Sequence, residues 1–187
     1  MSPTAKRATP LPPAARREAI VSAVLPFLVQ HGTAVTSRDL ARAAGVAEGT
    51  VFKAFRDKDE LYAAVMARAI DPEPVERRIE ALDPDVPFEE RLVIAAMFMQ
   101  HRLLDIWSLF GSIGASVIPP DQRRMPDSTA LTALFAGDSD LVRIPPAVAA
   151  RQFRSLVLAL SHPILNDPAP PAEEIVELFL HGVAAHP

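Results

Sequence analysis

The stretch AGVAEGTVFKAF, residues 44–55, gathers two glycines, a threonine, a lysine and two phenylalanines in one short segment. Gly49 lets another backbone approach closely, Thr50 offers a small hydroxyl donor, and Lys53 supplies a positive charge. These groups suit the phosphate oxygens of a nucleic acid. The composition does not suit a catalytic loop, so the stretch predicts binding rather than catalysis.

Signatures of catalysis are also absent from the rest of the sequence. It has no glycine-rich phosphate loop, no Gly-x-Ser-x-Gly elbow, no histidine pair at metal-ligand spacing and no cysteine. The five histidines are scattered, at positions 31, 101, 162, 181 and 186. We therefore expect no enzymatic activity, no cofactor and no metal site. One enzyme hypothesis stays open, in which His101 and Asp105 act on a small molecule.

Charge is distributed unevenly along the chain. The 187 residues carry 19 Lys or Arg and 23 Asp or Glu, a formal net charge of −4. Residues 1–68 hold ten of the bases and six of the acids, or +4, which leaves nine bases against 17 acids, or −8, for the remainder. A basic N-terminal third on an acidic body predicts a polyanionic partner that contacts one end only.

The N-terminal region also resembles a signal peptide, because basic residues precede the apolar stretch Ile20–Val29. Its apolar residues recur at helical spacing, however, and no small-residue cleavage site follows, which favours a helix of a folded domain. The run Leu92–Met99 is far shorter than the roughly 20 residues that span a bilayer. With 49% apolar residues and no cysteine, the chain is expected to be globular, cytoplasmic and without membrane contact.

Helix signals surround the opening stretch. Residues 1–13 are rich in proline and basic residues and should form a mobile arm. A helix is then predicted over 14–31, ended by Gly32, and Pro26 should kink it or split it.

The next two helices are short and separated by a glycine turn. Thr36 and Asp39 match a capping box that opens a helix over 37–44. Gly45 ends it, and a further helix is predicted over 48–55. A helix, a glycine turn and a second short helix form a helix-turn-helix, which leaves the second helix projecting.

Prolines and acidic residues separate the remaining helices. One is opened by the cap pattern DKDE at 57–60 and runs to about Ile70. The others are predicted over 74–82, 88–115, 127–136, 146–161 and 172–185. No long segment alternates with period two, so the fold should be all-α, with about nine helices. We expect a helix-turn-helix domain over 14–58 and a larger helical body over 59–187.

The two short helices should have one inward and one outward face. The apolar residues that would pack them against the first helix are Leu40, Ala41, Ala44, Val46, Val51 and Phe55. Glu48, Gly49, Thr50, Phe52 and Lys53 would face outward, and Lys58 would add charge. Glu48 either accepts a hydrogen bond from a cytosine amino group or favours the positive end of its own helix.

Residues 15–62 resemble the N-terminal signature of the TetR family of bacterial transcriptional regulators. The resemblance is carried by Thr36, Leu40, Ala41, Ala44-Gly45-Val46, Gly49-Thr50-Val51-Phe52, Phe55, Lys58, Glu60 and Leu61. It implies a homodimer whose recognition helices, residues 48–55 here, enter successive major grooves of a palindromic operator in double-stranded DNA. By position, it implies a DNA-facing set of Thr36, Ala47, Gly49, Thr50, Phe52, Lys53 and Lys58.

Three positions depart from the family pattern. Ala47 stands where serine is usual, so a cap worth ~1 kcal/mol should be missing. Phe52 replaces a common tyrosine and lacks its hydroxyl, and Ala54 replaces an aromatic residue or histidine. We expect modest affinity for the operator. The alternative is a helical hairpin that only packs, within a protein-interaction module that never binds DNA.

The helix over 88–115 carries a long stripe of methionine and aromatic residues. Such a stripe is usually core, but it can also form the wall of an adaptable apolar pocket. In that hypothesis the pocket residues are Phe98, His101, Arg102, Trp107 and Phe110, opposed by Phe135, Phe153 and Leu156.

The last two predicted helices, over 146–161 and 172–185, are apolar on more than one side. A helix with so little polar surface is buried by more than its own domain, so we expect a four-helix interface with a second copy. Its residues would be Leu156, Leu160, Ile175, Leu178, Phe179 and Val183. The sequence thus predicts a dimeric DNA-binding regulator, and the resemblance implies a repressor released by a small apolar or amphipathic effector.

Overall fold

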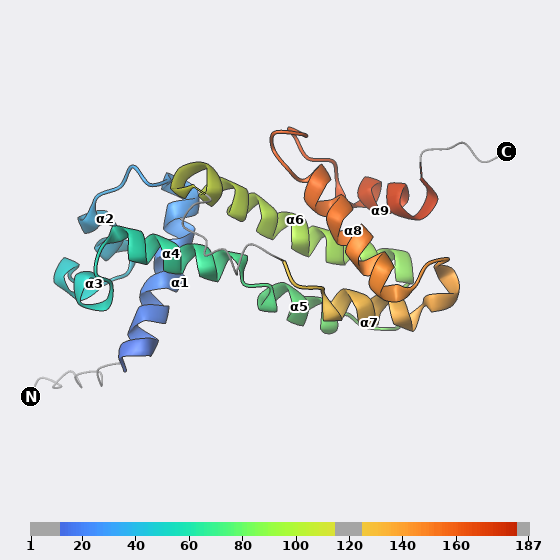
Figure 1. Ribbon diagram of the computed structural model, residues 1–187, viewed down its shortest axis with the longest axis horizontal. Helices are drawn as coiled ribbons and strands as arrows, with labels where there is room; N and C mark the ends of the chain where they lie inside the picture. The colour runs from blue at the N-terminus through green and yellow to red at the C-terminus, as the bar shows by residue number, and fades with distance from the viewer. Residues whose placement is uncertain (1–11, 115–124, 183–187) are drawn as a thin grey trace, which may run out of the picture. The chain divides into compact units, whose positions relative to one another are not determined.

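The computed structural model describes residues 12–114 and 125–182. Within these ranges the chain forms nine α-helices and one short 3-10 helix, with no β-strand (Figure 1). The predicted all-α fold class is therefore confirmed. The chain divides into two compact units, of which the first ends at Arg68 and the second begins at Ala69. Most of the predicted arm, residues 1–11, lies outside the described residues.

The first unit contains four helices. These are α1 (Pro13–His31), α2 (Ser37–Ala43), α3 (Glu48–Ala54) and α4 (Lys58–Ile70). The unit extends ten residues beyond the expected boundary at residue 58 and so takes in most of α4. Three polar contacts tie α4 to the rest of the unit. Lys58 Nζ donates to the Val35 carbonyl over 2.7 Å, Arg17 pairs with Glu60 over 2.8 Å, and Arg68 pairs with Glu18 over 3.2 Å.

Helix α1 is one continuous element. Pro26 lies inside it without splitting it. Its buried residues, Ile20, Val21, Val24 and Leu28, recur at helical spacing and form its inner face. Gly32 ends the helix with a positive φ of 66°, and its N–H donates to the Leu28 carbonyl.

Local signals also fix α2 and α3. Thr36 Oγ1 accepts from the backbone N–H of Asp39, and the Asp39 carboxylate accepts from the Thr36 N–H over 3.0 Å, which confirms the capping box. Gly45 makes the turn with a φ of 65°. Both helices pack on α1, and they bury Leu40 and Val51 completely.

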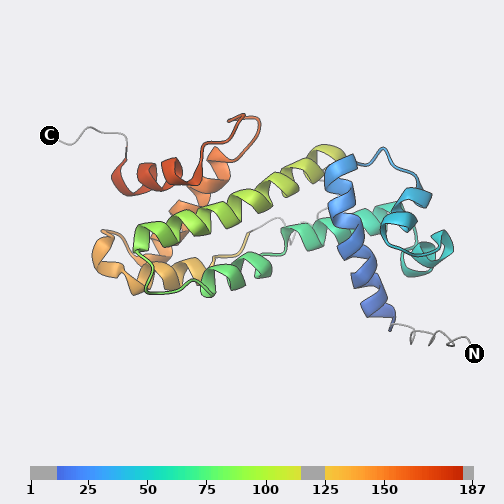
Figure 2. The ribbon, with the colours of Figure 1, turned by 180° about the vertical axis from the view of Figure 1, so that it is seen from behind.

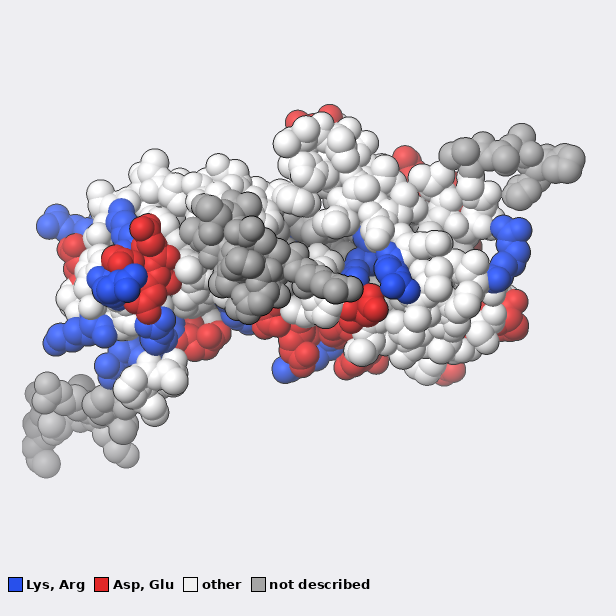
Figure 3. All heavy atoms as spheres, in the orientation of Figure 1, with Lys and Arg blue, Asp and Glu red and all other residues white. Residues whose placement is uncertain are grey.

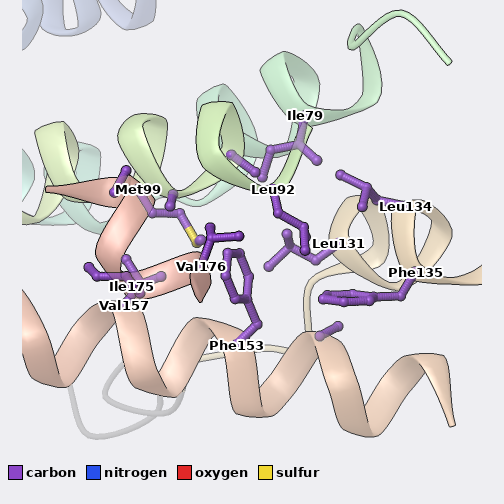
Figure 4. Packing of buried hydrophobic residues seen from close by; sticks show 14 of the residues in the cluster. Ile79, Leu92, Met99, Leu131, Leu134, Phe135, Phe153, Val157, Ile175 and Val176 are labelled. Atoms are coloured by element: carbon purple, nitrogen blue, oxygen red, sulfur yellow. The ribbon is translucent and has the colours of Figure 1, made fainter. Parts of the chain in front are cut away.

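The second unit contains the remaining elements. These are α5 (Glu73–Glu80), α6 (Phe88–Ile113), α7 (Thr129–Gly137), the 3-10 helix η3 (Ser139–Leu141), α8 (Pro146–Leu160) and α9 (Ala172–His181). Helix α6 lies between α9 and α5 (Figure 2), and α8 packs on α6, α7 and α9. Phe135 of α7 contacts the rings of Phe153 and Phe179 at centroid distances of 5.9 and 5.8 Å. Figure 4 shows Phe135 and Phe153 within this core, together with Leu92, Leu131 and Val176.

By length and composition α6 could cross a membrane, and no other helix in the described ranges could. Leu92, Ala95, Ala96 and Met99 of α6 nevertheless belong to the core of the second unit. The core helix of a soluble protein has the same composition, so α6 is weak support for a membrane span.

Candidate nucleic-acid interface and apolar cavity

Helix α3 lies at the outer edge of the α1–α4 unit in both ribbon views (Figures 1 and 2). Most of the predicted DNA-facing residues are exposed: Thr36, Ala47, Gly49, Phe52 and Lys53, whereas Thr50 and Lys58 are half-buried. The face drawn in Figure 3 carries several Lys and Arg side chains over this unit, interspersed with acids. The predicted set therefore comes from the start of α2, from α3 and from the start of α4, and Lys58 Nζ bonds the Val35 carbonyl next to Thr36.

The start of α3 has no side-chain cap. Ala47 is the N-cap residue, in an extended conformation with φ −69° and ψ 146°, and no side chain bonds the first backbone N–H groups. The missing cap predicted for this position is confirmed. A seven-residue helix without a cap depends on packing, which Val51 at 0% exposure and the adjacent Phe55 at 1% provide.

Three carboxylates in this unit are stabilised in their charged form. Hydrogen bonds from Thr36 lower the pKa of Asp39 below its ordinary value. The side chain of Arg56, and then the backbone N–H of Glu60, lower the pKa of Asp57. The backbone N–H of Arg56, and then the Arg17 side chain, lower the pKa of Glu60. Each carboxylate supports a helix start or a connection in the helix-turn-helix, so the conformation of this unit depends on their charge.

Acid should destabilise the α1–α4 unit. A carboxylate with a lowered folded-state pKa contributes stability above its unfolded-state value, here 3.8 for Asp39 and Asp57 and 4.5 for Glu60. That stability is lost as the pH falls through the lower folded-state pKa. We expect the thermal midpoint of this unit, followed by circular dichroism, to fall as the pH drops below about 4. The triple variant Asp39→Asn, Asp57→Asn, Glu60→Gln should show a shallower fall, and an equally steep one would contradict the assignment.

The second unit contains an apolar cavity of about 270 Å³. Its lining comes from Ile70 and Pro72 and from α5, α6, α7 and α8, with Met125, Pro126 and Ser128 at the entry to α7. Three predicted pocket residues, Arg102, Trp107 and Phe110, line it. Sequence reasoning missed the α5 residues Val75, Glu76 and Ile79. The spacing of Met99, Leu103 and Ile106 along one face of α6 is the signal that could have identified the α6 wall.

The other five predicted pocket residues lie elsewhere. Phe135 and Phe153 are fully buried in the core. Phe98 packs under the Arg78 guanidinium, 3.7 Å from its ring centre, and His101 is exposed, because both point away from the face of α6 that lines the cavity. Leu156 is half-buried on α8 outside the lining.

Three charged side chains of the cavity wall are bonded within the protein, whereas the buried Trp107 Nε1 has no hydrogen-bond partner among the described residues. Arg102 donates to the Asp71 carbonyl, and Arg154 donates to the Pro126 carbonyl. The Glu76 carboxylate accepts from the Ala130 N–H over 2.9 Å at the start of α7. These bonds join neighbouring elements around a mainly apolar interior, so the cavity suits an apolar or amphipathic molecule.

The predicted dimer residues divide into three groups. Ile175 is fully buried inside its own unit, so it cannot contact a second copy, which corrects the prediction for that residue. Helical spacing alone could not show which of the apolar sides of α9 faces the core. Leu156, Leu160, Leu178 and Phe179 are half-buried. Val183 lies outside the described residues.

Comparisons with known proteins point to one family. The family model described as bacterial regulatory proteins, tetR family, matches residues 20–65. The HTH-type transcriptional regulator YhgD of Bacillus subtilis (strain 168), itself uncharacterised, is 31% identical over 78 residues. That match covers 41% of this chain and 40% of YhgD, so it spans less than half of each protein.

Solved structures of regulators share the fold. A TetR transcriptional regulator from Streptomyces coelicolor is 21% identical, with a TM-score of 0.61 over 89% of this chain and 97% of that chain. The TetR-like regulator LfrR from Mycobacterium smegmatis, in complex with proflavine, is 20% identical, with a TM-score of 0.58 over 92% and 98%. The helix-turn-helix region, residues 20–65, therefore matches the TetR family of bacterial regulatory proteins, and the fold of both units is that of solved TetR-family regulators.

Proposed function

We propose that this protein is a homodimeric, sequence-specific DNA-binding transcriptional regulator, in which α3 enters the major groove and a small molecule releases the operator. One observation carries the DNA-binding part: Gly49 stands in an exposed helix without an internal reason to be glycine. Its φ is not positive, and a Cβ added at this position would meet nothing within 4 Å.

Glycine inside a helix costs about 1 kcal/mol relative to alanine. At Gly49 neither packing nor backbone conformation within the protein requires it, so the small residue supports close approach by an external partner. Half-buried Thr50 follows Gly49 in the sequence, and exposed Lys53 lies about one helical turn further along α3. A phosphate backbone fits all three residues, because it needs close approach, a hydrogen-bond donor and a positive charge.

Gly49→Ala should therefore raise the stability of the protein while it weakens DNA binding. We expect the variant to gain up to about 1 kcal/mol in free energy of unfolding, since alanine is the better helix former and meets no clash. Binding to operator DNA should nevertheless weaken, because the added methyl group blocks the approach of the duplex. Urea unfolding and a fluorescence-anisotropy titration on a duplex selected from a random DNA pool measure the two effects. A variant that is more stable and binds equally well would contradict the proposed docking surface.

Selection of bound fragments from the random DNA pool tests the main proposal, which is sequence-specific DNA binding by a homodimer. DNA fragments that bind should share a two-fold symmetric sequence, because a symmetric dimer presents two copies of α3, with half-sites about one helical turn apart or a little more. Footprint width then reports the distance between those copies. Recovery of fragments without a common sequence would overturn sequence-specific binding.

The proposed dimer uses the half-buried apolar residues of α8 and α9. Leu160 and Leu178 leave apolar surface exposed on the single chain, and a four-helix interface would cover it. Replacing both by glutamate should give a monomer in sedimentation experiments, because two charges would be placed in an apolar interface. A dimer that persists would exclude this face.

The proposed effector is a small apolar or amphipathic molecule that binds in the cavity of the second unit. The structural relative LfrR was solved with proflavine, which supports a small-molecule effector here. Such a molecule would release the operator if it bound better to a dimer whose α3 helices are wrongly spaced for successive grooves. The helix α4 spans residues 58–70, on both sides of the boundary between the units, and would carry that movement.

Trp107 makes ligand binding measurable, because it is the only tryptophan of the chain and lines the cavity. Anilinonaphthalene sulfonate should quench its emission in a saturable titration. Val75→Phe, which fills the cavity from α5, should remove that saturation, whereas Leu141→Phe at a position with 60% exposure should not. Equal quenching in both variants would place the probe elsewhere.

A further inference from the structure

The recognition helix α3 cannot fix its own direction. It has seven residues, and isolated helices shorter than about 12 residues are marginal in water. Its first turn also lacks the side-chain cap that Thr36 gives to α2. Contacts with the rest of the unit must therefore determine where α3 points, and both α1 and α2 pack against it.

Arg17 of α1 makes three contacts around the C-terminal end of α3. Its Nη1 donates to the carbonyl of Ala54, the last residue of α3. Its Nη2 donates to Glu60 Oε1 in α4 over 2.8 Å. The guanidinium carbon also lies 4.2 Å from the ring centre of Phe55, the C-cap residue of α3. A cation in this place is favoured by the negative end of the helix and by the face of the ring.

The second carboxylate oxygen of Glu60 bonds the backbone just after α3. Oε2 accepts from the backbone N–H of Arg56 over 2.7 Å, while Oε1 accepts from Arg17. One carboxylate thus joins α1, the start of α4 and the residue that follows the C-cap of α3. We name this arrangement the Arg17–Glu60 clamp.

We propose that Arg17 is a positioning residue for DNA binding, which sets the direction of α3 through the Arg17–Glu60 clamp and does not itself bind phosphate. The role rests on the proposed function. A guanidinium can bond two acceptors in different directions and lie over a ring at the same time, whereas a lysine ammonium cannot reproduce that geometry. Because Glu60 balances its charge, removing Arg17 should leave the number of phosphate contacts unchanged.

Salt dependence distinguishes this role from a phosphate contact. In the full chain, Arg17→Ala and Arg17→Lys should both weaken binding to the selected duplex about tenfold, as expected for losing a charge-assisted hydrogen bond. The slope of log affinity against log salt should stay at the wild-type value. A phosphate contact would instead reduce the slope by about 0.9 per contact, and Arg17→Lys would then keep most of the affinity.

Glu60→Gln is a second test, because the loss of charge and the loss of the clamp are expected to change DNA affinity in opposite directions. Loss of a negative charge near DNA would by itself tighten binding, but the clamp predicts weaker binding. The matched control is Glu18→Gln in α1, which removes a carboxylate that is 61% exposed and pairs with Arg68. That control should not weaken binding. Tighter binding by Glu60→Gln, or full affinity in Arg17→Lys, would overturn the proposal.

Hydrogen exchange on the free protein tests the clamp without DNA. Arg17→Ala should accelerate exchange of the α3 amides, while the amides at the buried face of α1 keep their wild-type rates. Unchanged exchange in α3 would overturn the proposal even if DNA binding falls. A wild-type protein that binds no DNA would overturn the proposed function and the role in binding, whereas faster exchange would still show that Arg17 holds α3.

Discussion

Phe55→Ala is expected to unfold the α1–α4 unit at 25 °C while the second unit stays folded. Phe55 is 1% exposed and is one of the largest fully buried side chains of the protein. Removal of a buried phenylalanine costs about 3–5 kcal/mol, which approaches the whole stability of a unit this small. The variant would also lose the ring that lies under Arg17. Operator binding should disappear.

The measurement is urea unfolding followed by circular dichroism, combined with limited proteolysis. Cleavage should become rapid before residue 68 and stay slow in the second unit, where the core formed by Phe135 and Phe153 is unchanged. Phe52→Ala is the matched control, since Phe52 is 37% exposed and its loss should change stability by less than about 0.5 kcal/mol. If both variants unfold like the wild type, or if Phe55→Ala unfolds the whole chain together, the two-unit interpretation is wrong.

The features that sequence predicted best are those with local causes. The capping box at Thr36 and Asp39, the turn at Gly45 and the end of α1 at Gly32 each depend on a few neighbouring residues. Proline and acidic residues marked the other helix ends in the same way. The prediction of a regulator and not an enzyme agrees with the match of residues 20–65 to a family of regulatory proteins.

The cavity and the proposed dimer face were harder to predict because they depend on packing between distant segments. Helix α6 is apolar on more than one side, so its sequence does not show that Trp107 lines a cavity while Phe98 packs under Arg78. The apolar pattern of α9 predicts Ile175 in a dimer interface, yet the core of its own unit covers it. The Arg17–Glu60 pair was also missed, because 43 residues separate its partners in sequence and no local rule connects them.

Lys53→Ala is expected to weaken operator binding by roughly 10- to 30-fold at physiological salt, whatever the sequence of the duplex. Lys53 is exposed on α3, and a symmetric dimer would lose two phosphate contacts. The slope of log affinity against log salt should therefore flatten by about two units, or 0.9 for each contact. Anisotropy titrations on operator and on unrelated duplexes, between 50 and 200 mM salt, measure both quantities.

The choice of Lys53 over Lys58 follows from their surroundings. Lys58 donates to the Val35 carbonyl, so Lys58→Ala would remove an internal hydrogen bond together with a charge. Its effect on DNA affinity could then not be separated from its effect on stability. Arg143→Ala is the control, because it removes one exposed cation from the second unit and should leave the slope unchanged. A protein-interaction module that never binds DNA would show no steep salt dependence at all. Parallel slopes for Lys53→Ala and the wild type would mean that α3 does not lie along the phosphate backbone.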